Sequence, residues 1–327
     1  MSTSAAPSPV FGIGTALLGF ALYAVHDALT KYLGTTYSVF QIIFFAMLFA
    51  FVPMAVMMLA DKSHGNFRPR HPWLVLIRTT ASLTALTCGF YSFTVLPLAE
   101  VYALLFAAPL LITVFAIPLL GEVVRAQRWA AVVVGLVGVL VVLRPGVSEL
   151  SLGHITALAS ACSNALASVI VRKIGNEERS AVLIIYPMLL AMALMGALLP
   201  GVYVPPSLPH MGLMATIGFL SVIAQICVIN GYRSAPAAVV APMQYSQILW
   251  AALFGLLFFS EHPDLYVGIG SSLIIGSGMF LVWRESRTAV SARNPVSRTF
   301  LARFALASNV LRRSDQPRTS PRESQAD

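Results

Sequence analysis

Ten stretches of about 20 residues, nearly free of charged side chains, constrain the fold of this chain more than any other feature. That length is what an α-helix needs to cross the hydrocarbon core of a membrane. The 327 residues are 57% hydrophobic and 10% charged, whereas charged residues make up about a quarter of an ordinary soluble domain. We predict an all-α membrane protein with ten transmembrane helices, near residues 10–32, 38–60, 73–95, 99–120, 127–144, 153–174, 181–200, 210–232, 236–260 and 264–284.

The two halves of the chain resemble each other. Residues 97–122 recur 139 positions later as residues 236–261, and both segments begin with Pro and end with Glu. At an offset of 141 positions, Lys31 aligns with Arg172. Internal repeats in a membrane protein are typical of transporters, which bind their substrates between the repeats. We predict a first five-helix repeat at residues 10–144, a second at residues 153–284 and a basic tail at residues 285–327.

The basic residues predict the orientation of the chain. If the N-terminus is cytoplasmic, 18 Lys and Arg residues fall in or beside the cytoplasmic loops and tail, whereas Lys31 and Arg144 fall on the outer side. We therefore expect a multi-pass protein of a bacterial inner membrane with both termini in the cytoplasm. Because each repeat has five helices, an odd number, the two repeats must have inverted orientations.

The basic tail carries half of the net charge of +8. Residues 297–313 place several apolar side chains on roughly one helical face beside Arg residues. They either lie on an anionic membrane surface or form a solvated basic segment. Residues 314–327 have the composition of a disordered segment. A basic tail by itself does not indicate nucleic-acid binding, and we expect none.

Sequence signatures of enzymes and of metal sites are absent. The chain has no Walker A loop, no HExxH and no GxSxG motif, and its longest soluble loop is too short for an ATP-binding domain. Cys88, Cys162 and Cys227 lie in separate predicted helices without a second thiol at the spacing of metal ligands. We expect a transporter that is not an enzyme and has no cofactor and no metal site.

Ionisable side chains inside the predicted helices are few, and each is a candidate for function because charge is costly to bury in a membrane. Asp27 and Lys31 lie one turn apart on one face of the first helix. Either they form an ion pair that anchors the end of the helix, or Asp27, together with His26, contacts substrate or carries a coupling proton. Arg78, near the start of the third helix, either extends to the membrane surface or contacts substrate.

Glu100 opens the fourth predicted helix, directly after a tight turn around Pro97. A carboxylate at a helix N-terminus is stabilised by the helix dipole, which would be a structural role. The equivalent position in the second repeat is Val239, so the two halves do not need the acid equally. This asymmetry favours a specific role for Glu100 in substrate binding or ion coupling.

Amide and aromatic side chains replace charge in the second half. Within a membrane such groups need polar partners, which are either other helices or a bound solute. Phe106 and Tyr245 occupy equivalent positions of the repeat, as do Tyr91 and Asn230. Aromatic walls with amide donors suit a flat or amino-acid-like organic molecule. The residues that we expect to line the cavity are Tyr91, Tyr102, Asn164, Gln225, Asn230, Gln244, Tyr245 and Gln247.

Proline and glycine mark where the helices bend and where they approach closely. Pro109, Pro118, Pro187 and Pro242 fall inside predicted helices, where they can interrupt the backbone hydrogen bonds. The glycines of the fifth and tenth helices predict close packing, either between the two halves or between two copies of the protein. The second alternative would give a homodimer. These glycines are Gly135, Gly138, Gly268, Gly270 and Gly276.

Residues 11–284 resemble the EamA group of the drug/metabolite transporter superfamily. The motif that carries the resemblance is Leu-Pro-Leu-Ala-Glu at residues 96–100, followed by Pro109-Leu110, Gly121-Glu122, Gln127 and Gly135. Arg78 matches a recurrent Arg of the group. Residues 26–33 resemble a subgroup that includes riboflavin and S-adenosylmethionine importers. The resemblance implies two inverted five-helix repeats and a central cavity built from helices one, three, four, six, eight and nine.

We therefore expect a secondary transporter that moves a small organic metabolite by alternating access. Uptake of a riboflavin-type substrate is favoured; S-adenosylmethionine and amino acids are the other substrates considered. An exporter of amino acids or other metabolites is the alternative within transport. A membrane sensor or scaffold that signals through its basic tail is the alternative outside transport.

Overall fold

The structure is a computed structural model that describes residues 9–59, 68–121, 126–145, 150–175, 177–178, 180–235 and 237–289. Glu122, Pro236 and the segment after residue 289 lie outside the described residues, and so do the predictions made for the basic tail.

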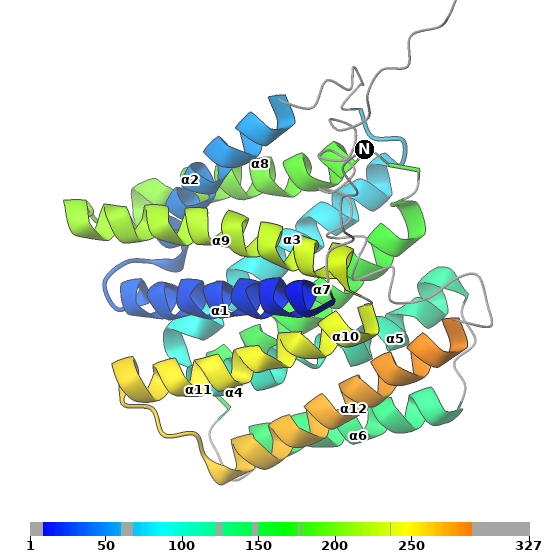
Figure 1. The fold of residues 1–327 in the computed structure, drawn as a ribbon. Coiled ribbons are helices and arrows are strands. Elements are labelled where there is room, and N and C mark those ends of the chain that lie inside the picture. Colours follow the sequence, from blue (N-terminus) through cyan, green and yellow to red (C-terminus); the bar gives the residue numbers. More distant parts are fainter. Residues whose placement is uncertain are drawn as a thin grey trace, which may run out of the picture.

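The secondary-structure elements of the described residues are all helical (Figure 1). They form a bundle of roughly antiparallel helices. In chain order they are α1 (Pro9–Gly34), α2 (Val39–Leu59), α3 (Pro72–Val95), α4 (Leu98–Leu105), α5 (Ala108–Leu120), α6 (Ala126–Leu143), α7 (Leu152–Ile174), α8 (Ser180–Leu198), the 3₁₀ turn η1 (Leu199–Gly201), α9 (Leu208–Ser234), α10 (Ala237–Val240), the 3₁₀ turn η2 (Ala241–Tyr245), α11 (Ser246–Phe259) and α12 (Leu265–Ala289).

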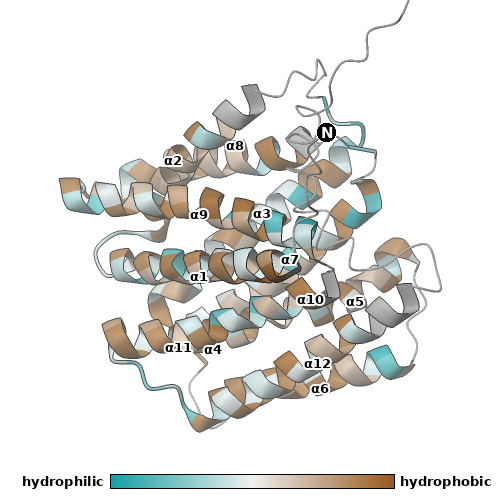
Figure 2. Cartoon of the chain, in the orientation of Figure 1, coloured by the Kyte–Doolittle hydropathy of each residue, from teal (hydrophilic) through white to brown (hydrophobic). Residues whose placement is uncertain are grey.

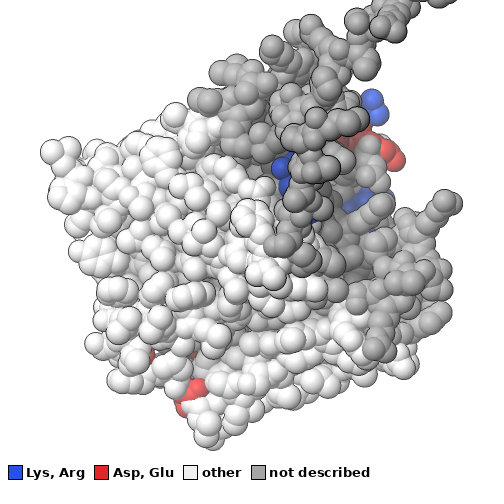
Figure 3. All heavy atoms as spheres, in the orientation of Figure 1, with Lys and Arg blue, Asp and Glu red and all other residues white. Residues whose placement is uncertain are grey.

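The predicted transmembrane spans agree with these helices to within a few residues at most ends. Within the described residues, nine helical segments are long and apolar enough to cross a membrane, and Val39–Ala55 is a shorter apolar helix. The described part of the face in Figure 3 is almost free of charged side chains between its two ends. In Figure 2 the loop between α11 and α12 is hydrophilic, whereas hydrophobic colours predominate along the helices. The arrangement is that of an all-α protein with a lipid-facing belt.

Two predicted spans are broken, and each break lies beside a proline. The fourth span divides into α4 and α5 at Phe106, three residues before Pro109. The ninth divides into α10, η2 and α11, with Pro242 inside η2. Proline has no N–H to donate to the preceding turn, which explains both interruptions. Pro118 and Pro187 lie inside helices that continue through them.

The helices pack in pairs that join the first half of the chain to the second. We assign α1–α6 to the first repeat and α7–α12 to the second. Helix α1 packs against α9, and its counterpart α7 packs against α3. Helix α2 packs against its own counterpart α8, and α6 packs against α12 at the opposite side of the bundle (Figure 1). Each of these helices therefore packs against a helix of the other half, as is expected of inverted repeats.

The predicted close packing of glycines is found between α6 and α12. A Cβ at Gly270 would lie 2.6 Å from the Gly138 carbonyl oxygen, and a Cβ at Gly138 would lie 2.8 Å from that of Gly270. The two backbones therefore touch. At Gly268 and Gly276 no atom lies within 4 Å of an added Cβ, so these two glycines do not mediate close packing within the chain.

Because the helices alternate in direction, the loops gather at two ends of the bundle. We call them the Lys31 end, where α1, α3 and α11 finish, and the Arg172 end, where α7 and α9 finish. The positive-inside count predicts that the Arg172 end faces the cytoplasm and the Lys31 end faces outward.

Candidate substrate-binding site

A buried carboxylate in the Lys31 half of α1 is the centre of a polar cluster. Asp27 is 8% exposed. Its carboxylate is hydrogen-bonded to His26 Nδ1 at 2.7 Å and accepts a hydrogen bond from the Tyr102 hydroxyl of α4. The Tyr102 oxygen in turn accepts from Gln247 Nε2 of α11 at 3.3 Å. One chain of hydrogen bonds therefore connects the two repeats. We call its members the Asp27 cluster: His26, Asp27, Tyr102 and Gln247.

Aromatic rings surround the Asp27 cluster. Phe93 and Phe106 lie 5.4 and 5.8 Å from the Tyr102 ring, measured between centroids, and Phe90 lies 5.5 Å from His26. Tyr245 of η2 contacts Phe106 edge to face at 5.0 Å. A carboxylate among aromatic faces can attract an organic cation both by charge and by cation–π interaction.

A second contact between the repeats lies nearby on the same helix. The Tyr23 hydroxyl of α1 donates to Gln225 Oε1 of α9 at 2.7 Å. Tyr23 and Asp27 are four residues apart, so they lie on neighbouring turns of one face. Their face of α1 therefore contacts the second repeat through Gln225 and the first repeat through Tyr102.

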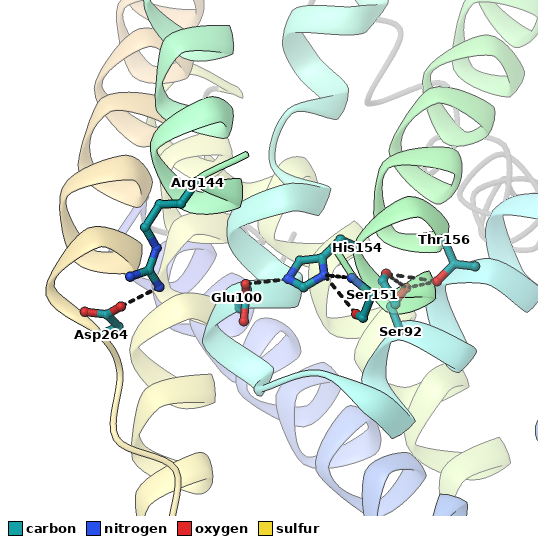
Figure 4. A network of polar contacts seen from close by, with 8 residues as sticks. Ser92, Glu100, Arg144, Ser151, His154, Thr156 and Asp264 are labelled. Atoms are coloured by element: carbon teal, nitrogen blue, oxygen red, sulfur yellow. Dashed lines mark hydrogen bonds and ion pairs between the residues drawn. The ribbon is translucent and has the colours of Figure 1, made fainter. Parts of the chain in front are cut away.

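Glu100 belongs to a separate network at the N-terminus of α7 (Figure 4). The Ser151 backbone N–H donates to His154 Nδ1 at 3.1 Å, and the Ser151 hydroxyl lies 2.8 Å from the same nitrogen. An N–H can only donate, so Nδ1 accepts and the proton of a neutral imidazole sits on Nε2. Nε2 therefore donates to Glu100 Oε1, which lies 2.8 Å away. This pair connects α4 of the first repeat to α7 of the second.

Lys31 contacts the end of α11 rather than Asp27. Its ammonium group lies 2.6 Å from Glu261 Oε1 and also donates to the Leu96 carbonyl. The ion pair expected between Asp27 and Lys31 is therefore not the one formed. Asp27 and Lys31 each have a partner beyond α1, Tyr102 for Asp27 and Glu261 for Lys31, which spacing along α1 cannot reveal.

A comparison with family models decides which family the chain represents. The model described as the EamA-like transporter family matches residues 10–144 and residues 151–283, which together make up most of the chain. The chain belongs to the EamA-like transporter family.

Curated relatives of this EamA-like chain are transporters of different substrates. An S-adenosylmethionine uptake transporter of Rickettsia felis is 24% identical over 84% of this chain and 94% of its own length. The pseudopaline exporter CntI of Pseudomonas aeruginosa is 28% identical over 81% and 93%. A riboflavin transporter of Rhizobium johnstonii is 26% identical over 67% and 73%. A solved crystal structure shares the fold with a TM-score of 0.55 at 21% identity, covering 86% of this chain and 99% of that one.

The EamA-like fold brings some of the predicted site residues together and separates others. Asp27, Tyr102 and Gln247 form one cluster, with Gln225 and Tyr245 beside it through Tyr23 and Phe106. Glu100 lies in its own network. Tyr91, Asn164, Asn230 and Gln244 are half-buried on α3, α7, α9 and η2, which are not the elements that carry the Asp27 cluster.

Arg78 is buried in the Arg172 half of α3. Its Nη1 donates to the Leu183 carbonyl of α8, so the guanidinium contacts a helix backbone. His154 was not among the predicted site residues. Its one signal in the sequence is its position three residues after Ser151, the spacing of a capping box, with His in the place usually held by Glu or Gln.

Proposed function

We propose that this protein takes up a small organic cation by alternating access across a bacterial inner membrane, with both termini in the cytoplasm. The substrate class is a metabolite that combines a positive charge with a flat ring, as S-adenosylmethionine does. Transport between the two repeats requires neither catalysis nor a bound cofactor.

The observation that carries the substrate class is the environment of Asp27. Its described partners are the His26 imidazole and the Tyr102 hydroxyl, and Lys31 is engaged with Glu261. A largely buried carboxylate whose described partners include neither Lys nor Arg favours a cationic ligand, because burying a charge is costly unless an opposite charge compensates it. The surrounding rings favour a ligand with an aromatic face.

Riboflavin, the substrate favoured by the sequence, remains the second candidate. The amides of Gln225 and Gln247 and the nearby rings suit a flat heteroaromatic molecule, and one relative is named a riboflavin transporter. Riboflavin has no cationic group for Asp27, which is why we place it second.

Transport by purified protein in liposomes tests this proposal. We expect saturable uptake of labelled S-adenosylmethionine that an excess of the unlabelled compound blocks. Riboflavin and phenylalanine serve as the neutral and the zwitterionic competitor. A ligand screen by thermal shift uses the same panel, since binding to the native state raises the melting temperature. Saturable uptake of riboflavin with no competition by the cation would replace the primary candidate with the second.

Direction of transport and the role of the tail need separate measurements. One relative is an exporter, so accumulation must be compared with efflux in cells that produce the protein. Truncation after Ala289, the end of α12, tests the sensor or scaffold alternative. A transporter core keeps its uptake rate after this truncation, whereas a protein that acts through its tail loses its activity.

A further inference from the structure

An ion pair closes the Lys31 end of the bundle at the boundary between the repeats. Lys31 belongs to α1 of the first repeat, and Glu261 follows α11 of the second. Their charged groups are 2.6 Å apart, and the side chains are 12% and 17% exposed. The Lys31 ammonium also lies 5.5 Å from the centre of the Phe259 ring. The pair is thus mostly withdrawn from solvent, which strengthens it relative to a surface ion pair.

The same two side chains satisfy backbone groups where α3 ends and α4 begins. Lys31 donates to the carbonyl of Leu96, the residue that caps α3, and Glu261 Oε2 accepts from the N–H of Leu98, the first residue of α4, at 3.0 Å. Groups at helix ends have no partner within their own helix. The positive ammonium of Lys31 thus faces a carbonyl oxygen, and the negative carboxylate of Glu261 faces an N–H group. Exchanging the two residues would place the carboxylate against the carbonyl oxygen and the ammonium against the N–H group.

The turn after α11 holds Glu261 in this position. Ser260 adopts a left-handed conformation with φ of 54°, and the Glu261 N–H donates to the Gly255 carbonyl at 3.0 Å. The Glu261 carboxylate lies over Gly255, where an added Cβ would stand 2.8 Å from Oε2. Glu261 is thus oriented toward α4 by its own backbone, independently of Lys31.

The ion pair lies close to the Asp27 cluster, one helical turn away along α1 and one helical turn away along α4. On α1, Asp27 precedes Lys31 by four residues. On α4, Leu98, which donates to Glu261, precedes Tyr102, which donates to Asp27, by four residues. One turn of a helix rises about 5.4 Å. The ion pair and the helix ends that it contacts therefore lie between the Asp27 cluster and the loops of the Lys31 end.

We propose that Lys31 and Glu261 form the gate of the transport path at the Lys31 end. The gate is closed in this structure, and it opens when the pair separates and releases the link between α3 and α4. The inference rests on the proposed alternating access, because a path that opens to one side at a time requires such a closure. By the positive-inside count this gate faces outward.

Accessibility of a buried cysteine tests the gate without any substrate. Ala99, which is 7% exposed, lines a small cavity beside Glu261 and Gly255. In a variant with Cys88, Cys162 and Cys227 replaced by Ser, Ala99→Cys is labelled in liposomes with a thiol reagent that does not cross membranes. We expect Lys31→Gln and Glu261→Gln each to raise the labelling rate about tenfold, because removing one partner of a mostly buried pair destabilises the closed arrangement.

Matched variants separate gating from damage to the fold. Lys31→Arg retains the charge and should keep labelling slow, whereas the exchange Lys31→Glu with Glu261→Lys should not restore slow labelling. Arg144, just after α6, and Asp264, just before α12, form another ion pair between the repeats, 2.5 Å apart but more exposed. Arg144→Gln should leave labelling of Ala99→Cys unchanged. Pro205→Cys, exposed at the same end, should be labelled at one rate in all backgrounds.

Equal labelling of Ala99→Cys in the parent, Lys31→Gln and Glu261→Gln would overturn the gate. An equal increase in Arg144→Gln would also overturn it, since any loosened contact between the repeats would then expose the site. Failure of the proposed function would be seen in a different experiment. The parent protein would then transport none of the candidate substrates, whereas the labelling rates of Ala99→Cys, which are measured without substrate, would not be affected.

Discussion

Phe106 and Tyr245 hold equivalent positions in the two repeats, and their rings meet edge to face with centroids 5.0 Å apart. Phe106 caps α4 where the fourth span breaks, and Tyr245 ends η2 where the ninth span breaks. The interrupted helices of the two halves therefore meet each other beside Tyr102. Inverted-repeat transporters bind substrate and coupling ions at such a meeting of discontinuous helices.

Tyr102→Phe should weaken both stability and transport while retaining the aromatic ring. Asp27 and Gln247 would each lose a hydrogen-bond partner, at a cost of about 1–3 kcal/mol for buried polar groups. The melting temperature of the purified protein and the uptake rate in liposomes measure the two effects. Tyr266→Phe on the exposed face of α12 is the matched control and should change neither. A Tyr102→Phe variant with parental stability and uptake would show that its hydroxyl has no role in the cluster.

Glu100→Gln separates the charge of Glu100 from its hydrogen bond. The Gln carbonyl oxygen can still accept from His154 Nε2, so we expect normal membrane insertion and a folded protein. If Glu100 carries a coupling proton, uptake falls and loses its dependence on a pH gradient. His154→Ala removes both the bond to Glu100 and the acceptor for the Ser151 backbone N–H, and should reduce stability by about 1–3 kcal/mol. Parental uptake by Glu100→Gln over a range of pH gradients would leave Glu100 with a structural role.

Gly270→Ala tests the contact between α6 and α12. The added Cβ would stand 2.5–2.6 Å from Val142 and from the Gly138 carbonyl, so the two helices must separate. We expect a loss of about 1–3 kcal/mol, typical of overpacking, seen as a lower melting temperature. Gly268→Ala, two residues earlier in α12, meets no atom within 4 Å and should be neutral or slightly stabilising. Equal melting temperatures for the two variants would contradict the packing described for this pair.

The membrane helices and their inversion were predictable because they depend on composition and on the placement of Lys and Arg. The broken fourth and ninth spans were indicated by Pro109 and Pro242, since a missing N–H acts locally. Pro118 and Pro187 carry the same local signal, yet α5 and α8 continue through them. A proline therefore shows where a helix can be interrupted, while the tertiary structure decides whether it is.

Side-chain partners were less predictable than helices. Spacing along α1 suggested Lys31 as the partner of Asp27, whereas the structure pairs Lys31 with Glu261, far away in sequence. His154 was missed for the same reason, because its partner Glu100 lies on a helix of the other repeat. Such pairs depend on how the two repeats dock, and a single sequence does not record that geometry.

Equilibrium binding of S-adenosylmethionine to the purified protein, compared between the parent and Asp27→Asn, tests the proposed function most directly. Asp264→Asn, which removes a carboxylate at the surface, is the control and should bind as the parent does. We predict saturable binding by the parent and an affinity at least about tenfold lower for Asp27→Asn, since hydrogen bonds and contacts to a charged group contribute about 1.5–3 kcal/mol. Equal affinity of the parent and Asp27→Asn, in a folded variant, would contradict the assignment of Asp27 as the cation-binding residue.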